Sequence, residues 1–269
     1  KILWVDLSRK KLKDEVLDEK LCRQFIGGYG ISARILFSRQ KAGADPLGPD
    51  NILGFATGVL TGTPALGGSR YMVVAKSPLT GTWGDANSGG YFGPHLKFAG
   101  YDTVFFTGIS EKPVYLFIDN GKAELRDAAR LWGKDSFETE DMLKAELGKD
   151  VEVACIGPSG EKLVLIAAVM NNKGRAAARS GLGAVMGSKK LKAIAVKGSI
   201  KVPMANENEA NELRKKNIND IGLPASPLLK DVGTPGFFNG NAENGDAPCK
   251  NWGGVSLIDF PDYKNIGQD

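Results

Sequence analysis

Two basic loops in the sequence have the composition of an anion-binding site. The first is Gly67-Gly68-Ser69-Arg70, which leads into a predicted strand at 71–76. A glycine turn that meets a strand can hold the Arg70 guanidinium rigidly, and a planar guanidinium suits a phosphate or the edge of a heterocycle. Taken alone, the same loop also fits a surface arginine that solvates a turn.

The second basic loop, residues 171–183, places Arg175 and Arg179 four positions apart with three alanines between them. If this segment is helical, the two arginines share one face. Alanine leaves the backbone open to close approach, so the loop resembles a cradle for a flat anionic ligand. A short alanine-rich helix with two solvated arginines is the alternative interpretation.

A third loop, Ala86-Asn87-Ser88-Gly89-Gly90-Tyr91-Phe92-Gly93, combines small residues with an asparagine. Successive backbone amides and carbonyls of such a loop can contact a ligand. The loop lies in a stretch, 54–100, that holds eleven glycines. A packed core does not require that density, whereas a backbone wrapped closely against a ligand does. A plain glycine-rich turn remains the alternative.

Composition and charge exclude several classes of protein. The 269 residues are 42% hydrophobic and 25% charged, which is ordinary for a soluble globular protein. The balance of 35 basic against 31 acidic residues does not suit an electrostatic nucleic-acid binder. No apolar run approaches the length of a transmembrane helix. We therefore expect a cytoplasmic protein without nucleic-acid or membrane partners.

Several familiar chemical motifs are missing or lack their context. The three cysteines, Cys22, Cys155 and Cys249, form no C-x-x-C pair, so this chain alone offers no zinc or iron–sulfur motif. The segment 28–33 matches G-x-G-x-x-A, but it follows a predicted helix rather than the strand that a dinucleotide site needs. His95 is the one histidine, which leaves no nucleophile set of the Ser–His–acid kind.

The periodicity and turn signals predict an α+β fold with mixed or antiparallel β-sheets and flanking helices. Asn120-Gly121 predicts a hairpin, and Asp135 with Glu138 predicts a capped helix start. The predicted strands are 2–7, 12–16, 51–57, 71–76, 103–107, 114–118, 122–125, 151–156, 163–169 and 191–196. The predicted helices begin at Asp18 and span 31–37, 135–147 and 206–217.

A faint internal repeat also appears in the sequence. The hairpin near Asp6 resembles the one near Asp119, and the strand with its glycine loop around Val59 resembles that around Val169. The offset wanders near 110 residues, so an internal duplication is a hypothesis. The character of the chain changes after Val202-Pro203, and we expect one domain over 1–204 and the start of a second, mostly helical and truncated, domain over 205–269.

Taken together, these loops resemble the tungsten-containing aldehyde:ferredoxin oxidoreductase family. Nine motifs match in order over roughly residues 1–204, and nine in register are a specific signal. They are Thr57-Gly-Val-Leu-Thr-Gly-Thr, Gly68-Ser-Arg70-Tyr, Lys76-Ser-Pro-Leu-Thr-Gly81, Ala86-Asn-Ser-Gly-Gly-Tyr-Phe-Gly93, Leu96-Lys-Phe-Ala-Gly-Tyr-Asp102, Lys112-Pro-Val-Tyr, Ile156-Gly-Pro-Ser-Gly-Glu161, Arg175-Ala-Ala-Ala-Arg179 and Gly183-Ala-Val-Met-Gly-Ser-Lys189.

The resemblance implies an amino-terminal base domain that cradles tungsten held by two pterin dithiolenes. It implies a magnesium ion that bridges the pterin phosphates and is met by the backbone carbonyls of Asn87 and Ala176. It implies two-electron oxidation of an aldehyde to a carboxylic acid, with a 4Fe-4S cluster passing electrons to ferredoxin. The pterin contacts that it implies are Arg70, Asn87, Gly89, Arg175, Ala176, Ala178 and Arg179.

The cluster cysteines and the acid/histidine pair near tungsten belong to other domains of the family, so the resemblance implies an amino-terminal part that is inactive alone, with no catalytic residue of its own. One alternative is the tungsten subunit of an aromatic-thioester reductase of the benzoyl-CoA type. Another, of a different class, is a non-catalytic module that binds a phosphate or nucleotide. The aldehyde, the choice of tungsten over molybdenum and the oligomeric state, for which a homodimer is one option, stay open.

Overall fold

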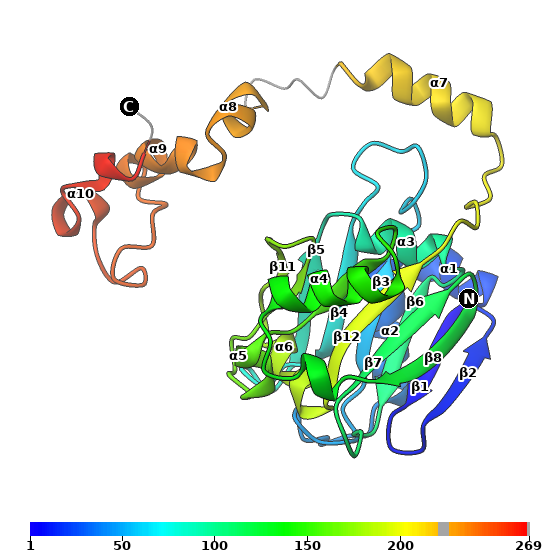
Figure 1. Cartoon of the computed structure of the whole chain (residues 1–269). Coiled ribbons are helices and arrows are strands. Elements are labelled where there is room, and N and C mark those ends of the chain that lie inside the picture. The colour runs from blue at the N-terminus through cyan, green and yellow to red at the C-terminus, as the bar shows by residue number, and fades with distance from the viewer. Residues whose placement is uncertain (220–225, 268–269) are drawn as a thin grey trace. The chain divides into compact units, whose positions relative to one another are not determined.

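The computed structural model describes residues 1–219 and 226–267 of the chain. The chain forms two compact units, Lys1–Glu207 and Asn208–Asp269. Both β-sheets lie in the first unit, and the described part of the second consists of short helices and loops (Figure 1). The sequence places a domain boundary at 204/205, and the larger helical domain expected to follow it stays a prediction.

Sheet A is six-stranded, with the order β2-β1-β6-β3-β4-β5. Its strands β1 and β6 are parallel, and the other neighbouring pairs are antiparallel. The hairpin predicted from the amino-terminal alternation is the pair β1–β2. The strands are β1 (Ile2–Asp6), β2 (Lys11–Glu15), β3 (Leu53–Thr57), β4 (Tyr71–Lys76), β5 (Trp83–Ser88) and β6 (Thr103–Thr107).

Sheet B repeats the topology of sheet A. Read from its β8 edge, its order is β8-β7-β12-β9-β10-β11, so every strand lies six places later in the chain than its counterpart in sheet A. The parallel pair is again equivalent, β7 with β12. The strands are β7 (Val114–Asp119), β8 (Lys122–Asp127), β9 (Glu152–Cys155), β10 (Val169–Asn171), β11 (Arg175–Ala177) and β12 (Leu191–Lys197).

This repeated strand order supports an internal duplication and corrects one of its expected correspondences. The hairpins β1–β2 and β7–β8 are equivalent, as the sequence suggests. The match between Val59 and Val169 is wrong, because Val59 follows β3, whereas Val169 begins β10, the counterpart of β4. Connections of different length in the two repeats shift the offset, which hides the correct register in the sequence.

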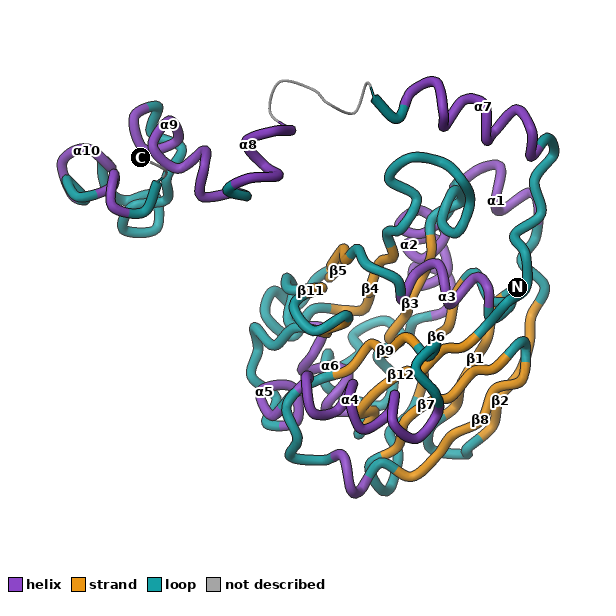
Figure 2. Tube along the Cα trace, turned by 45° about the horizontal axis from the view of Figure 1, so that its top comes forward, coloured by secondary structure: helices purple, strands orange, loops and turns teal. Residues whose placement is uncertain are grey.

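Helices occupy equivalent places in the chain order of the two repeats, and Figure 2 shows them in purple against the orange strands. Helix α2 connects β2 to β3 as α4 connects β8 to β9, and α3 precedes β6 as α6 precedes β12. Helices α3 and α6 each contact strands of both sheets, so they join the repeats into one body. The helices are α1 (Glu19–Phe25), α2 (Gly28–Arg39), α3 (Phe92–Phe98), α4 (Ser136–Leu147), α5 (Pro158–Glu161) and α6 (Leu182–Ser188), with a 3₁₀ turn at Ala129–Leu131.

Alternation along the central strands of sheet B shows how its two faces are buried. In β7, Leu116 and Ile118 enter the core shared with sheet A, whereas Tyr115 and Phe117 point to a second core. Leu143 of α4 packs into that second core. Because successive side chains of a strand point to opposite faces, a run that is apolar throughout predicts a strand covered on both sides.

Local signals explain where several of these elements begin and turn. The Asp135 side chain accepts from the Glu138 N–H at 2.8 Å, and the Glu138 carboxylate accepts from the Asp135 N–H at 3.3 Å. This is the predicted capping box, and it starts α4. Asn120 and Gly121 both have positive φ, 45° and 86°, which is the tight hairpin turn that this dipeptide predicts.

The sequence misplaces one strand and misses several short elements. The predicted strand over 163–169 is wrong, since only Val169–Asn171 forms β10. Leu163 has φ of 58°, and the Val164 N–H donates to the Ser159 carbonyl as a turn. This turn is as rich in apolar side chains as a strand, but it pairs with no neighbouring strand among the described residues. Its apolar side chains are exposed, such as Ile166 at 69%. Strands β5 and β11 and helix α6 lie in glycine- or alanine-rich segments where periodicity is weak.

The second unit has a small core of its own. Ala242, Ala247 and Tyr263 are buried, and Phe238 and Phe260 pack against them. The elements are α7 (Glu207–Asn217), where the division falls, then α8 (Ser226–Asp231), α9 (Phe238–Glu243) and α10 (Ser256–Asp259), with 3₁₀ turns at Thr234–Phe237 and Tyr263–Asn265.

One lysine lies inside the first unit without a carboxylate partner. Lys189 follows α6 and is 0% exposed, and its Nζ donates to the Gly108 carbonyl at 3.1 Å. Burial lowers the pKa of Lys189 from 10.5 to about 8, because a low-dielectric surrounding disfavours the charged form. Its positive charge therefore costs stability at neutral pH.

We predict that Lys189→Met raises the free energy of unfolding below pH 8 by about 1–3 kcal/mol, the net of a removed buried charge and an orphaned Gly108 carbonyl. In the wild type, the unfolded chain binds more protons than the folded chain between about pH 8 and 10.5, so stability rises with pH across that window. Urea unfolding at several pH values should show this rise in the wild type and a flatter profile in the variant. Lys112→Met, at an exposed position, is the control, and equal profiles for Lys189→Met and the wild type would refute the argument.

Candidate functional site

The loops singled out in the sequence meet where the two sheets approach each other at one edge. Strand β5 is an edge strand of sheet A and β11 is an edge strand of sheet B, and the two lie side by side (Figure 1). Arg70 immediately precedes β4, Asn87 lies in β5, and Arg175 begins β11. The duplicated topology therefore brings equivalent edges of the repeats to one place.

Hydrogen bonds hold Arg70 at the start of β4. The hydroxyl of Thr61 donates to the Arg70 carbonyl at 2.8 Å and accepts from the Gly58 N–H at 3.0 Å. The guanidinium itself donates to Oδ1 of Asn87 at 2.7 Å. Both the backbone and the side chain of Arg70 are thus positioned before any ligand binds.

The guanidinium groups of Arg70 and Arg175 converge on Gly89. A Cβ added to Gly89 would lie 3.7 Å from Nε of Arg70 and 3.8 Å from Nη1 of Arg175. Gly89 is buried, whereas both arginines are exposed. Two cations beside one stretch of bare backbone repel each other in the absence of an anion, so the arrangement suits a ligand with more than one negative charge.

Protein carboxylates do not neutralise these cations. Among residues 1–219 and 226–267, no ion pair joins Arg70, Arg175 or Arg179 to an acidic side chain. Other arginines have such partners, and they are Arg9, Arg23, Arg39, Arg126 and Arg130. Positive charge without a protein carboxylate partner therefore lies at the β5–β11 edge, where it is available to a ligand.

The second basic loop is not helical. The helix considered for Arg175 and Arg179 is wrong, because residues Arg175–Ala177 form β11 and pair with β10. Arg179 lies beyond the end of this strand and is exposed, as is Ala178. The structure thus brings Arg70 and Arg175 together beside Gly89, and Arg179 lies on the same loop, two residues past the end of β11.

A pocket of about 310 Å³ opens beside Arg70 and Asn87. Glycines form much of its wall, among them Gly27, Gly58 and Gly68. A Cβ on Gly68 would lie 2.7 Å from the carbonyl oxygen of Leu60, so the wall has no room for side chains there. The glycine density noted in the sequence accordingly serves close backbone approach around this pocket.

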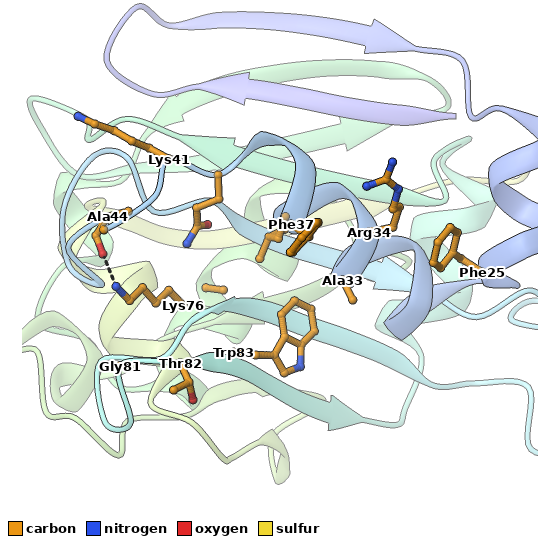
Figure 3. A pocket seen from close by; sticks show the side chains of 14 residues that line it. Phe25, Ala33, Arg34, Phe37, Lys41, Ala44, Lys76, Gly81, Thr82 and Trp83 are labelled. Atoms are coloured by element: carbon orange, nitrogen blue, oxygen red, sulfur yellow. Dashed lines mark hydrogen bonds between the residues drawn. The ribbon is translucent and has the colours of Figure 1, made fainter.

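A larger pocket, about 830 Å³, lies at the other end of β5 and is apolar in character. Figure 3 shows Phe37 and Trp83 across from each other in it. Lys76 lines it, but its Nζ donates to the Ala44 carbonyl at 2.7 Å. No carboxylate, histidine or cysteine is among its described lining residues. The smaller pocket is the candidate site because Arg70 and Asn87 line it, whereas the larger pocket lies away from the loops that the sequence singles out.

Side chains suited to metal binding are not grouped in the described part of the chain, where no cluster of three His, Cys, Asp or Glu residues could hold an ion. Cys22, Cys155 and Cys249 are unpaired thiols. Burial raises the pKa of Cys155 to about 12, which keeps that thiol protonated and unreactive. A cation at the site would therefore be met by backbone oxygens, by amide or hydroxyl side chains, or by the ligand itself.

Sequence reasoning missed one residue that organises the site. Asn171 is 1% exposed and lies between the two repeats, where its side chain bonds to Tyr71, Ser88 and the Gly89 carbonyl. The only signal in the sequence is its place beside Asn172 at the start of the basic loop. An asparagine at this position is typical of an ordinary turn. Its role could not be predicted locally, because its partners are about 80–100 positions away along the chain.

The duplicated two-sheet fold has a basic seam, the place where the edge strands β5 and β11 meet beside Arg70 and Arg175. This fold and this seam define the class of protein. This chain belongs to the aldehyde ferredoxin oxidoreductase family, and the family described as "Aldehyde ferredoxin oxidoreductase, N-terminal domain" matches residues 2–198. The membership establishes an oxidoreductase family and confirms the resemblance seen in the motifs.

The names of individual relatives are more specific than the description of the family. The chain is 46% identical over 261 residues to the tungsten-containing aldehyde ferredoxin oxidoreductase of Pyrococcus furiosus, and equally to that of Thermococcus kodakarensis. In each case the match covers 94% of this chain and 42% of the relative. It is 34% identical to a protein of Pyrococcus furiosus named "Aliphatic sulfonate oxidoreductase, WOR-like subunit". The chain thus spans about two fifths of the length of these relatives.

A solved structure shares the fold. It is described as the active site complex BamBC of benzoyl coenzyme A reductase in complex with 1,5-dienoyl-CoA. The TM-score is 0.81 at 38% sequence identity, and the match covers 86% of this chain and 35% of that one. This likeness confirms the predicted α+β architecture.

Gly90 offers a test of how tightly the site is packed. Its φ is 90°, and a Cβ there would lie 2.3 Å from Oδ1 of Asn172 and 2.8 Å from Nδ2 of Asn171. We predict that Gly90→Ala lowers the free energy of unfolding by about 1–3 kcal/mol more than Gly67→Ala does, because backbone strain is common to both and the clash is not. Gly67 also has positive φ, 76°, but a Cβ there meets nothing within 4 Å. Thermal unfolding measures both, and equal losses would show that the predicted contact is absent.

Proposed function

We propose that this chain is the cofactor-binding amino-terminal part of a tungsten enzyme that oxidises aldehydes to carboxylic acids. The observation that carries the proposal is the convergence of Arg70 and Arg175, without carboxylate partners, on the bare backbone at Gly89. Family membership and relatives named as tungsten-containing aldehyde ferredoxin oxidoreductases support it. A phosphorylated, flat cofactor such as a pterin matches both the charge and the glycine-walled space.

A cofactor with two similar halves fits the duplicated fold. Asn87 pairs with Met72, the second residue of β4, and Ala176 pairs with Met170, the second residue of β10. Since β4 and β10 are equivalent strands, Asn87 and Ala176 occupy equivalent positions in the two repeats. Their backbone carbonyls would hold the proposed magnesium ion, whose charge would offset that of the phosphates of the two pterins.

The remaining proposed contacts are side-chain cations and small residues. Arg70, Arg175 and Arg179 bind phosphate or pterin edges through charge-assisted hydrogen bonds. Gly89 and Ala178 allow the backbone to approach the cofactor closely. The bound tungsten supplies the two-electron redox chemistry, and the residues of this chain bind and orient the cofactor that carries it.

Other parts of the proposed reaction involve residues outside this chain. Ferredoxin, the partner that the names of the relatives supply, is the proposed electron acceptor, and a 4Fe-4S cluster ligated by residues outside this chain would supply the one-electron transfer to it. We propose a cytoplasmic enzyme. In keeping with this, no helix in the described ranges has the length and apolar character to cross a membrane.

A second candidate function within the family is reduction of an aromatic thioester. The benzoyl-CoA reductase complex, with its TM-score of 0.81, favours it. The higher identity, 46% against 38%, favours the aldehyde enzyme. The non-catalytic phosphate-binding module is the weakest of the three, because the family is one of oxidoreductases.

The proposal is tested on the full-length protein. Stoichiometric tungsten with pterin is expected, and their absence would return the non-catalytic module to consideration. Aldehyde-dependent reduction of a viologen dye is expected from the aldehyde enzyme. Reactivity with an aromatic thioester in place of an aldehyde would select the second candidate.

We predict that Arg175→Ala lowers tungsten and pterin occupancy of the full-length protein, because one charge-assisted clamp on a phosphate is worth about 1.5–3 kcal/mol. The fold should be retained, since the Arg175 side chain is exposed. Metal analysis and circular dichroism measure the two outcomes. Arg34→Ala is the matched control, because Arg34 is also exposed and lies on α2 beside the larger pocket. Occupancy equal in both variants would remove Arg175 from the site.

A further inference from the structure

The two repeats do not share a sheet at the site. Strand β5 belongs to sheet A and β11 to sheet B, so no continuous backbone ladder sets the distance between the groups that each repeat contributes. The side chain of Asn171, at the end of β10, helps to set this distance. Its Oδ1 accepts from the Tyr71 hydroxyl at 2.9 Å and from the Ser88 hydroxyl at 2.8 Å, and its Nδ2 donates to the Gly89 carbonyl at 2.9 Å.

The neighbouring residue continues the link. Oδ1 of Asn172 accepts from the Tyr91 N–H at 2.8 Å and from Nδ2 of Asn171 at 2.9 Å. Its Nδ2 donates to the carboxylate of Glu152 in β9. Asn171 and Asn172, which we call the asparagine pair, therefore attach the 89–91 turn of the first repeat to β9 and β10 of the second.

The turn that carries Arg175 is held from its other side. Asn172 and Lys173 both have positive φ, 45° and 62°, a conformation that costs non-glycine residues about 1–3 kcal/mol each. The Lys173 N–H donates to the carboxylate of Glu140 at 2.9 Å, and Glu140 is 2% exposed. The strained turn is thus fixed by buried acceptors just before the chain reaches Arg175.

These contacts reach the cationic groups directly. A Cβ on Gly90 would lie 2.3 Å from Oδ1 of Asn172 and 2.8 Å from Cδ of Arg175. The asparagine pair, the Gly90 backbone and the Arg175 side chain therefore pack as one unit. Any loosening of the pair changes the position of Gly89 relative to Arg175.

We infer that the asparagine pair is a positioning element for cofactor binding. It sets the separation between the contacts of the first repeat, Arg70 and Gly89, and the Arg175 contact of the second. In this proposal the pair positions the cofactor contacts and is not one of them. This inference rests on the proposed function, and it assigns to Asn171 and Asn172 a role in geometry beyond stability.

Asn171→Leu tests the inference, with Asn51→Leu as the matched control. Asn51 is also buried, at 0% exposure, and its side chain also makes several backbone bonds, to Pro46 and Lys76. Both variants remove a buried amide of similar connectivity, so both should lower the unfolding temperature. Only Asn171→Leu should also weaken retention of the cofactor.

The measurement uses full-length protein that contains cofactor. Tungsten and pterin are determined during dialysis, at a fixed interval below each variant's own unfolding temperature. Loss about 10- to 100-fold faster than in the wild type is expected for Asn171→Leu, the size typical for groups that orient ligands. The W(V) electron paramagnetic resonance signal of the retained fraction should shift in Asn171→Leu and not in Asn51→Leu. Equal retention and equal signals in the two variants would overturn the inference.

Asn172→Gly keeps the test decisive if Asn171→Leu does not fold. Glycine adopts positive φ freely, so this variant removes the side-chain bonds and leaves the backbone conformation accessible. Asn120→Gly is its control, because Asn120 has the same φ of 45° and its Oδ1 also accepts a backbone N–H, from Ser199 at 2.9 Å. Faster cofactor loss in Asn172→Gly alone supports the inference, and equal loss in both contradicts it.

The outcome also separates this inference from the proposed function. Wild-type protein that holds neither tungsten nor pterin would refute the proposed function, whatever the variants do. Wild-type protein that holds both, with variants that retain them like their controls, would refute the inference alone.

Discussion

The site depends on repulsion between like charges that the fold does not relieve. Arg70 immediately precedes a strand of sheet A and Arg175 begins a strand of sheet B, yet both guanidinium groups lie beside Gly89, and neither has a carboxylate partner in the described chain. Here the shared core between the sheets, with α3 and α6 packed against strands of both, holds the two strands in place. Two cations held close together without a carboxylate between them make this edge attractive to anions.

The duplication explains why a site arises at this position. Two copies of one topology place equivalent edge strands, β5 and β11, side by side, so backbone positions such as Asn87 and Ala176 are related by the repeat. The side chains have diverged, since one position is an asparagine and the other an alanine. A ligand with two similar ends can therefore meet similar backbone groups, while the arginines supply contacts that differ between the ends.

Two buried polar side chains of the first unit differ in how fully their hydrogen-bonding capacity is satisfied. Asn171 has its main bonding capacity used by partners from the other repeat, so its burial adds specificity at a modest cost. Lys189 is equally buried but donates to one carbonyl, and burial lowers its pKa to about 8. The first arrangement orders the seam, whereas the second only lowers stability at neutral pH.

The sequence by itself determined the local features of this protein. Turn and cap chemistry at Asn120-Gly121 and Asp135 predicts elements that the structure contains, because such signals act over a few residues. The basic loops and their motifs also identify the family. Periodicity failed in the glycine- or alanine-containing strands β5 and β11, and it predicted a strand over 163–169 where residues 163–166 form an exposed apolar turn.

Only the tertiary structure decided which of these residues meet. Arg70 and Arg175 are about 100 positions apart along the chain, and Asn171 reaches partners at similar distances. Contacts of that range depend on strand order and on which sheet edges lie together. No local pattern encodes these choices, because they are set by the packing of two whole repeats around one core.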